Sequence, residues 1–328
     1  MIISTGINRL PVSTLFIAFL AVSAAGEIPW KIGETTYVVR EGSAFEVRGS
    51  SEVFVTRLHE PGYLGKTYFK RGGKIYRRDG DGRGHPVRTL FKEGFENARE
   101  IADLIGPRRG WSAFTLQSPK ARTVRHYVDL RNRILRGEGG FLDNRVEPSA
   151  ARARGGAASL RCLAHPPNRR MVTSKASLET GLAYFTRNDD FWFSGHYFLA
   201  GGLPGGLMDL EATYIENAPG PRILLDEEGV PRVELKWADK PTYRMSNPAP
   251  FPRGRWVRLT VHFFLHESKG LVELWLDGRR IIQARGPTLP FPETVLDSVE
   301  LGLTAAHPGA VSEVFVDDVV YSAKPLNP

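Results

Sequence analysis

A histidine and an arginine share one face of a β-hairpin predicted from Trp256 to Ile282. Alternation of apolar and polar residues puts Arg258 and His262 opposite the apolar face of its first strand. Histidine can transfer protons near neutral pH, and arginine binds carboxylates. On the second strand, Trp275 shares the polar face with Glu273, where its indole could stack on a sugar ring or cover the core from outside. This face is therefore a candidate surface for a charged sugar.

A pair of carboxylates stands on another strand-like segment, Leu207–Ile215. Asp209 and Glu211 are two residues apart and share one strand face, so they could serve as nucleophile and acid of a glycoside hydrolase. The usual hydrolase motif on such strands is Glu-x-Asp-x-x-Glu, with a third acid. Only the Asp209-Leu210-Glu211 part is present here, which places hydrolysis behind the other functions considered below.

Further groups suited to acid-base or ionic chemistry occur on two other segments. Alternation places His196 on the polar face of its strand and its neighbour Tyr197 among core aromatics. Farther along the chain, Lys236 and Arg244 could contact carboxylates, and Tyr243 could act as an acid or a base. Each of these three could equally be an ordinary solvated residue.

Short strands separated by Gly, Pro and Asp dominate the sequence after residue 155. This density of strands without intervening helices is typical of an antiparallel sandwich or barrel. About a dozen strands in a chain of this length predict an all-β protein of the larger jelly-roll type. Helical signals are few: Asn97–Ile105 is expected to form two turns, and His126–Leu135 a helix or an irregular strand.

The start of the chain is expected to lie outside this jelly roll. Residues 1–25 have the layout of a signal peptide, in which the apolar run Thr14–Val22 is too short to span a bilayer. An uncleaved membrane anchor is the alternative. Residues 26–88 indicate a small β-rich segment, and two Gly-Lys-x-Tyr units beginning at Gly65 and Gly73 predict a hairpin. We therefore expect a secreted or periplasmic protein that is not an integral membrane protein.

The net charge of +8 is concentrated in one part of the sequence. Between Arg99 and Lys175 there are sixteen basic and six acidic residues. Such a concentration attracts polyanions, although scattered arginines can also simply keep a surface solvated. Because export is expected and no nucleic-acid-binding motif is present, we expect the partner to be an acidic polysaccharide and not a nucleic acid.

Several segments follow one another in the order found in a known family. Residues 156–161 and 174–179 precede Asp189–Leu199 (DDFWFSGHYFL), the hairpin described above, and Phe315–Val319 (FVDDV). This order resembles the concanavalin-A-like jelly roll, and within it the polysaccharide lyases of the heparin-lyase-I and glucuronan-lyase type. The resemblance covers roughly residues 89–323. Its strongest element is the hairpin, which indicates the fold more than the reaction.

The resemblance also implies roles for individual residues. Lys175 stands where the family has an arginine, and His196 and His262 fall near polar positions of the family's cleft. The family's Gln-Trp-His strand should lie near Met208–Tyr214, where only Glu211 is suitably placed. The cleft outline is thus expected, with part of its polar set replaced.

The same resemblance implies a structural Ca²⁺ held between the first and last strands by carboxylate and carbonyl oxygens. Glu96 and Asp318 fall at matching positions. The Asp317-Asp318 pair could equally cap a turn.

Taken together, the sequence predicts a jelly-roll domain over residues 89–323 that binds a uronate-containing polysaccharide and cleaves it by β-elimination. Such a reaction needs a cation to neutralise the C5 carboxylate, a base for the adjacent proton and an acid for the leaving oxygen. The expected catalytic residues are His196, His262, Lys175 and Tyr243, and the expected substrate-binding residues are Arg244, Lys236, Arg258, Trp275 and Glu211. A non-catalytic carbohydrate-binding module of the same fold is the second possibility, and a glycoside hydrolase the third.

Overall fold

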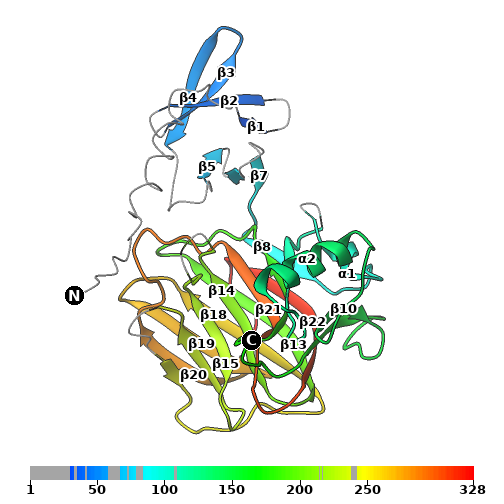
Figure 1. Cartoon of the computed structure of the whole chain (residues 1–328). Helices are drawn as coiled ribbons and strands as arrows, with labels where there is room; N and C mark the ends of the chain where they lie inside the picture. Colours follow the sequence, from blue (N-terminus) through cyan, green and yellow to red (C-terminus); the bar gives the residue numbers. More distant parts are fainter. Residues whose placement is uncertain are drawn as a thin grey trace, which may run out of the picture.

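Two large antiparallel sheets dominate the protein (Figure 1). The computed structural model describes residues 30–32, 35–40, 43–57, 67–71, 74–78, 84–106, 109–213, 215, 217–237 and 242–328. The signal peptide predicted for residues 1–25 lies outside them. Within these ranges, no helix combines the length and the apolar character needed to cross a membrane.

The first large sheet has eight antiparallel strands. Across the sheet the order is β10 (Arg145–Ser149), β11 (Ser159–Ala164), β22 (Ser312–Ser322), β13 (Asp190–Gly201), β18 (Trp256–Phe264), β19 (Gly270–Leu276) and β20 (Arg279–Gly286), and β8 (Leu90–Glu93) pairs with one end of β22. The predicted hairpin is therefore β18–β19.

The second large sheet has seven antiparallel strands. Its order is β17 (Thr242–Arg244), β16 (Pro231–Leu235), β15 (Pro221–Leu225), β14 (Pro204–Glu211), β21 (Ser298–Ala306), β12 (Lys175–Thr180) and β9 (Ala113–Gln117). The connections run back and forth between the two sheets, as in a jelly roll. The prediction of an all-β jelly-roll sandwich is confirmed.

The core lies between the two sheets and follows the alternation read from the sequence. On β18, Val257, Leu259 and Val261 are fully buried, as the pattern predicts. Tyr197 on β13 is also fully buried, and its hydroxyl donates to the backbone oxygen of Leu207 on β14 at 3.2 Å. This bond joins the two sheets across the core. Each sheet consequently keeps one outer face for polar side chains.

Two short helices lie beside the edge strands β9 and β10: α1 (Ile101–Leu104) and α2 (Val124–Leu135). At the start of α2 the side chain of Thr123 accepts the backbone N–H of His126, a standard N-cap. The segment His126–Leu135 is therefore helical. α1 is shorter than predicted mainly because it begins only at Ile101, where Glu100 is the N-cap and forms a capping box with Asp103.

The N-terminal part forms two small sheets. One contains β1 (Trp30–Ile32), β2 (Thr35–Arg40), β3 (Ser43–Arg48) and β4 (Ser51–Arg57), and the other contains β5 (Thr67–Arg71), β6 (Lys74–Arg78) and β7 (Gly84–Pro86). Antiparallel pairing of β5 with β6 confirms the hairpin predicted from the repeated unit.

One side chain of the N-terminal part is buried against the sandwich. Tyr68 on β5 is 1% exposed, and its ring centroid lies 4.8 Å from that of Tyr184. Its hydroxyl donates to Oδ2 of buried Asp297 at 3.4 Å. The second small sheet is thus attached to the jelly roll by a side chain, and a domain boundary near residue 88 stays a prediction.

Candidate functional site

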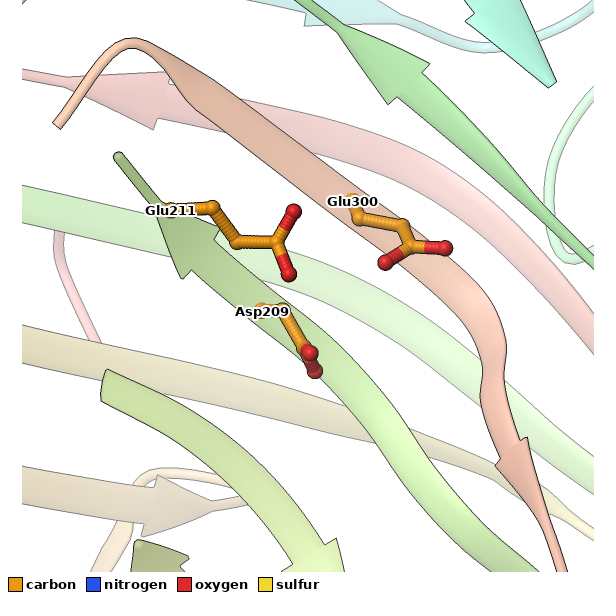
Figure 2. Close-up of side chains that lie close together, drawn as sticks. All are labelled: Asp209, Glu211 and Glu300. Carbon is orange, nitrogen blue, oxygen red and sulfur yellow. The ribbon is translucent and has the colours of Figure 1, made fainter. Parts of the chain in front are cut away.

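Three carboxylates converge on the outer face of the seven-stranded sheet (Figure 2). Asp209 and Glu211 project from β14, because the residues that alternate with them, Met208 and Leu210, are fully buried in the core. Glu300 projects from the neighbouring strand β21, whose register places it directly opposite Asp209. The three side chains are 1%, 6% and 3% exposed, in the order Asp209, Glu211, Glu300. Such burial is costly for charged groups unless they are compensated.

A lysine and a hydroxyl group on the adjacent strand β12 supply that compensation for Glu300. Lys175 on β12 places its Nζ 2.9 Å from Glu300 Oε2. Ser177, two residues farther along the same face, donates to the other carboxylate oxygen at 2.5 Å. Both partners belong to the strand that pairs with β21, so the β-sheet register itself builds the contact.

A second lysine compensates the two carboxylates of β14. Lys236, just after β16, hydrogen-bonds to Glu211 Oε1, and its Nζ lies 3.5 Å from Asp209 Oδ2. Thr304 of β21 donates to Asp209 Oδ1 at 2.8 Å. The side chains of Lys175 and Lys236 are 18% and 15% exposed, so both are less deeply buried than the carboxylates they contact.

The cluster has unusual proton affinities. Burial, followed by the charges of Glu300 and Asp209, raises the pKa of Glu211 to about 8, against the opposing effect of the two lysines. For Lys175, burial alone would lower the pKa, but the charges of Glu300, Asp209 and Glu211 outweigh it and hold the pKa above its usual value. Lys175 is therefore a permanent cation at neutral pH, whereas Glu211 exchanges its proton close to neutrality.

The three carboxylates also have the geometry of a cation site. One oxygen from each of Asp209, Glu211 and Glu300 lies within 4.8 Å of the others, so a single metal ion could contact all three. In the structure, Lys175 and Lys236 provide the positive charge at this place. A metal ion would have to compete with both ammonium groups.

An arginine-lined pocket adjoins the cluster on the same sheet face. It has a volume of about 460 Å³, and its charged lining residues are Arg222, Arg232, Arg244, Asp226, Glu227, Glu228 and His307. Arg232 and Arg244 are directly opposite each other on β16 and β17. A terminal nitrogen of Arg222 donates to Glu234 at 2.6 Å, and the buried Nε atoms of Arg222 and Arg232 have no hydrogen-bond partner in the described part of the chain. Facing like charges and an unpartnered N–H are suited to binding a carboxylate.

Pocket and cluster are continuous across the sheet. The register places Glu300 beside Asp209, Asp209 beside Arg222, and Arg222 beside Glu234. One row of charged side chains, three acidic and one basic, therefore crosses four strands, from β21 to β16. We call this row, with Lys175, Lys236, Glu211 and the arginine pocket, the polar face.

The residues predicted as one site are divided between the two sheets. Lys175, Glu211, Lys236 and Arg244 belong to the polar face. His196, Arg258, His262 and Trp275 stand on β13, β18 and β19, on the outer face of the eight-stranded sheet. The whole core separates these two sets, so the expectation that they share one cleft is wrong.

His262 is held firmly on that second face. Its Nδ1 lies 3.0 Å from Glu273 Oε2, and its Nε2 lies 2.7 Å from Asp190 Oδ1. Its ring stacks on that of Trp192, with the two ring centroids 4.1 Å apart. Both ring nitrogens are occupied by carboxylates. Trp275 stacks in turn on Trp192 at 5.7 Å and is only 9% exposed, so it is part of this stack and not an open platform for a sugar.

His196 and Arg258 have local partners on the same face. Nδ1 of His196 lies 3.6 Å from Asp318 Oδ2, and burial, followed by the charge of Arg154, lowers the pKa of His196. Arg258 donates to Ser194 Oγ at 3.2 Å and to the backbone oxygen of Asn327.

Tyr243 points to the inner side of its sheet. It is paired with Val233, a core residue, and its hydroxyl donates to the backbone oxygen of Pro287 at 2.9 Å. Burial raises its pKa, which makes it a weaker acid. Its predicted role beside Lys236 and Arg244 does not agree with this orientation, since Arg244 faces outward and Tyr243 inward.

The two predicted calcium ligands face the same loop, residues 154–157. Glu96 accepts the backbone N–H of Ala157 at 2.6 Å, and Asp318 lies 3.1 Å from the Arg154 guanidinium. Each carboxylate thus has one donor from this loop, and Ca²⁺ at this place would compete with Arg154. Calcium at this place stays a prediction, and no step of the chemistry below depends on it.

Several residues of the polar face were not singled out from the sequence. Glu300, Ser177, Arg222 and Arg232 each alternate with buried apolar neighbours, as in Val299-Glu300-Leu301. An acidic residue inside such an apolar strand is the signal that could have found Glu300. Its proximity to Asp209 depends on the pairing of strands far apart in the sequence.

Comparison with solved structures agrees with this fold. The endo-β-1,4-glucuronan lyase of the fungus Trichoderma reesei superposes with a TM-score of 0.50 and 11% identity, over 71% of this chain and 95% of that one. The cellulose-induced protein Cip1 gives a TM-score of 0.44 with 16% identity, over 57% of this chain and 89% of that one. The alginate lyase vAL-1 from Chlorella virus gives 0.38 with 9% identity, over 55% and 90%.

At such low identity, the similarity to the glucuronan lyase supports the fold alone. The two structures with lower TM-scores support no further conclusion. The chain has the concanavalin-A-like jelly-roll fold, and the predicted resemblance to jelly-roll lyases is confirmed at that level. No protein-family model and no curated protein matches the sequence.

Proposed function

We propose that the polar face binds a uronate-containing polysaccharide and cleaves it by β-elimination. The observation that carries this proposal is the cluster of three buried carboxylates and two half-buried lysines beside an arginine-lined pocket. The arginines offer a place for the carboxylates of neighbouring sugar units. The cluster offers a permanent cation, Lys175, next to a carboxyl group that exchanges its proton near neutral pH.

The reaction can be written with the residues of the cluster alone. Lys175 and Lys236 contact the C5 carboxylate of the bound sugar and stabilise the negative charge that develops there. Ionised Glu211 removes the C5 proton, the C4–C5 double bond forms, and the C4–O bond breaks. Glu211 then gives the proton it has taken from C5 to the leaving C4 oxygen. This transfer applies when the C5 proton and the C4 oxygen leave from the same face of the sugar ring.

Hydrolysis is a second candidate, favoured by one specific observation. One oxygen of Glu211 and one of Glu300 lie no more than 4.8 Å apart, and retaining glycosidases also need two neighbouring carboxyl groups, about 5 Å apart. In that reaction protonated Glu211 would act as the acid, and Glu300, held by Lys175 and Ser177, as the nucleophile. The third candidate, a carbohydrate-binding module without activity, needs only the arginine pocket.

The products separate the candidates. The protein is incubated with a panel of polyuronates, and the unsaturated product of elimination is followed by its absorbance near about 235 nm. We expect absorbance to appear with at least one polymer. New reducing ends without absorbance would indicate hydrolysis, and binding without either would leave the non-catalytic module.

The pH profile gives an independent discrimination, because the two reactions need opposite forms of Glu211. Elimination needs the ionised form, so its kcat/KM should rise as the pH approaches about 8, whereas hydrolysis should fall there. Glu211→Gln should lower elimination by about 100-fold or more, which is typical for loss of a general base. The exposed Glu293→Gln is the matched control and should retain full activity.

We propose further that the protein is exported, with residues 1–25 as signal peptide, 26–88 as a small accessory segment and 89–323 as the catalytic domain. The apolar run followed by small residues supports export. Determining the N-terminal residue of protein recovered from outside the cytoplasm tests this. A chain that still begins at Met1 would overturn the cleaved signal peptide.

A further inference from the structure

A second positively charged surface lies at the ends of β9 and β12. The loop after β9 and the loop before β12 together line a depression of about 390 Å³, formed by Pro119, Lys120, Ala121, Asn168, Arg169 and Arg170. Lys120, Arg169 and Arg170 supply its charge. The side chains of Arg169 and Arg170 are exposed, and Lys120 is exposed as well.

The two loops are fixed to each other. Asn168 donates from its side-chain nitrogen to the backbone oxygen of Pro119 at 2.9 Å, and its side-chain oxygen accepts the N–H groups of Arg170 and Met171 at 2.9 Å each. In the loop after β9, the backbone N–H of Lys120 donates to the carboxylate of buried Asp143 at 2.9 Å. The backbone that presents these cations is therefore ordered in advance, which lowers the entropy cost of binding a ligand.

Two more arginines extend this surface toward α2. Arg122 lies just before the helix, and its backbone N–H donates to Nδ1 of His126 at 3.0 Å. Arg125 is in the first turn, and both arginine side chains are exposed. We call Lys120, Arg122, Arg125, Arg169 and Arg170 the loop cations.

The side chains of the loop cations differ from several other basic side chains in the same part of the chain, which are paired with acids. Arg136 is paired with Glu138 at 2.7 Å, and Arg161 with Glu313 at 2.7 Å. By contrast, none of the five loop cations forms an ion pair with a carboxylate of the residues that the structure describes. Five cations without direct ion pairs on one surface create a positive field that attracts anions.

The loop cations lie at the same end of the sheet as the proposed substrate site. Gln117, after which the first loop starts, is directly opposite Lys175 in the sheet. Buried Asn144 ties the two strand ends together by donating to the backbone oxygens of Gln117 and Lys175 at 2.8 and 2.9 Å. On the β21 side of β12, the backbone N–H of Ala306 donates to the backbone oxygen of Ser174 at 2.9 Å. The next residue, His307, lines the arginine pocket.

We propose that the loop cations form a second binding site for the acidic polysaccharide, outside the cleavage centre. Carboxylate groups of a chain that leaves the polar face past Lys175 would meet Lys120, Arg169 and Arg170, and then Arg122 and Arg125. Long chains would then bind at two linked places at once, which raises their affinity over short ones. The choice of a polysaccharide as the polyanion rests on the proposed function, whereas the existence of an anion site does not.

The test is a binding measurement with a charge-matched control. Binding of alginate chains, short alginate trisaccharides and uncharged dextran is measured by equilibrium titration for the wild-type protein and for K120E/R169E/R170E. The control is R253E/R279E/R285E, which changes the net charge equally at exposed arginines elsewhere on the protein. Thermal unfolding checks that both variants are folded.

We expect K120E/R169E/R170E to bind long alginate about tenfold more weakly at low salt and to show a shallower dependence of log Kd on log salt concentration. Trisaccharide binding and any cleavage of the trisaccharide should be unchanged, and the control variant should resemble the wild type. An equal loss in the control, or unchanged binding in K120E/R169E/R170E, would overturn the proposal. Stronger binding of single-stranded DNA than of alginate would overturn the assignment to a polysaccharide.

The outcome is independent of the proposed reaction. If no polymer is cleaved but the loop-cation variant alone binds long chains more weakly, the second site stands and the elimination proposal fails. If cleavage occurs and the variant binds and cleaves long chains like the wild type, the elimination proposal stands and the second site fails.

Discussion

Replacing Glu211 by glutamine tests the electrostatics of the polar face through the stability of the protein. Glu211 is 6% exposed, and burial together with the charges of Glu300 and Asp209 raises its pKa from 4.5 to about 8. Between these two pH values the unfolded chain releases the proton while the folded protein keeps it. Stability supplied by this group is therefore complete below pH 4.5 and is lost as the pH rises toward 8.

The size of the effect follows from the pKa. At about 1.4 kcal/mol for each pH unit, Glu211 lowers the free energy of unfolding by up to about 5 kcal/mol across this window. Glutamine cannot ionise, so E211Q lacks this loss. With roughly 2–4 °C per kcal/mol for a domain of this size, the Tm of E211Q should gain about 10 °C relative to the wild type between about pH 5 and pH 8.5.

Circular dichroism melts at closely spaced pH values measure this difference. Only the change of the Tm difference with pH matters, because the lost hydrogen bond to Lys236 shifts the E211Q curve by a nearly constant amount. Glu293→Gln, at an exposed loop position, should follow the wild type throughout. Parallel wild-type and E211Q profiles would refute a buried carboxyl with a raised pKa, and with it the proton-transfer role proposed for Glu211.

Other variants separate the two sheet faces and the two proposed sites. His262→Ala should cost about 3 kcal/mol of stability in urea unfolding, because it removes two bonds to carboxylates and the stack on Trp192, yet leave cleavage intact. A folded His262→Ala protein without activity would move the reaction to the eight-stranded sheet. Arg232→Ala should raise KM for a polyuronate several-fold at constant kcat; a fall in kcat alone would contradict a pure binding role. Added Ca²⁺ should raise the Tm of the wild type more than that of Glu96→Gln, and equal shifts would remove calcium from that place.

Alternation in the sequence predicted the environment of individual residues well. It placed Val257 and Leu259 in the core, His262 on an outer face, and Tyr197 among buried aromatics, all as observed. The physical reason is that the side-chain period of a strand is local and needs no knowledge of its neighbours.

Alternation could not tell which outer face a residue belongs to. A sandwich has two outer faces with the same polar pattern, so His262 and Lys175 look equivalent in the sequence although the core lies between them. Only the order of strands within each sheet assigns a face, and that order joins β14 with β21 across some ninety residues of sequence. The contact between Asp209 and Glu300, and so the candidate site itself, was hidden for this reason.

The contact of Tyr68 with Asp297 links the N-terminal part to the chemistry of the polar face. Asp297 precedes the strand that carries Glu300, and its backbone N–H donates to the backbone oxygen of Glu211 at 2.8 Å. Its carboxylate also accepts the backbone N–H and the hydroxyl of Thr213. A hydroxyl from the accessory segment thus reaches a residue that anchors the ends of both strands bearing the acidic cluster. Tyr68, which lies before residue 89, therefore supports the strand ends next to the site. A chain shortened at that residue would keep every polar-face side chain yet lose one of the supports that fixes their spacing.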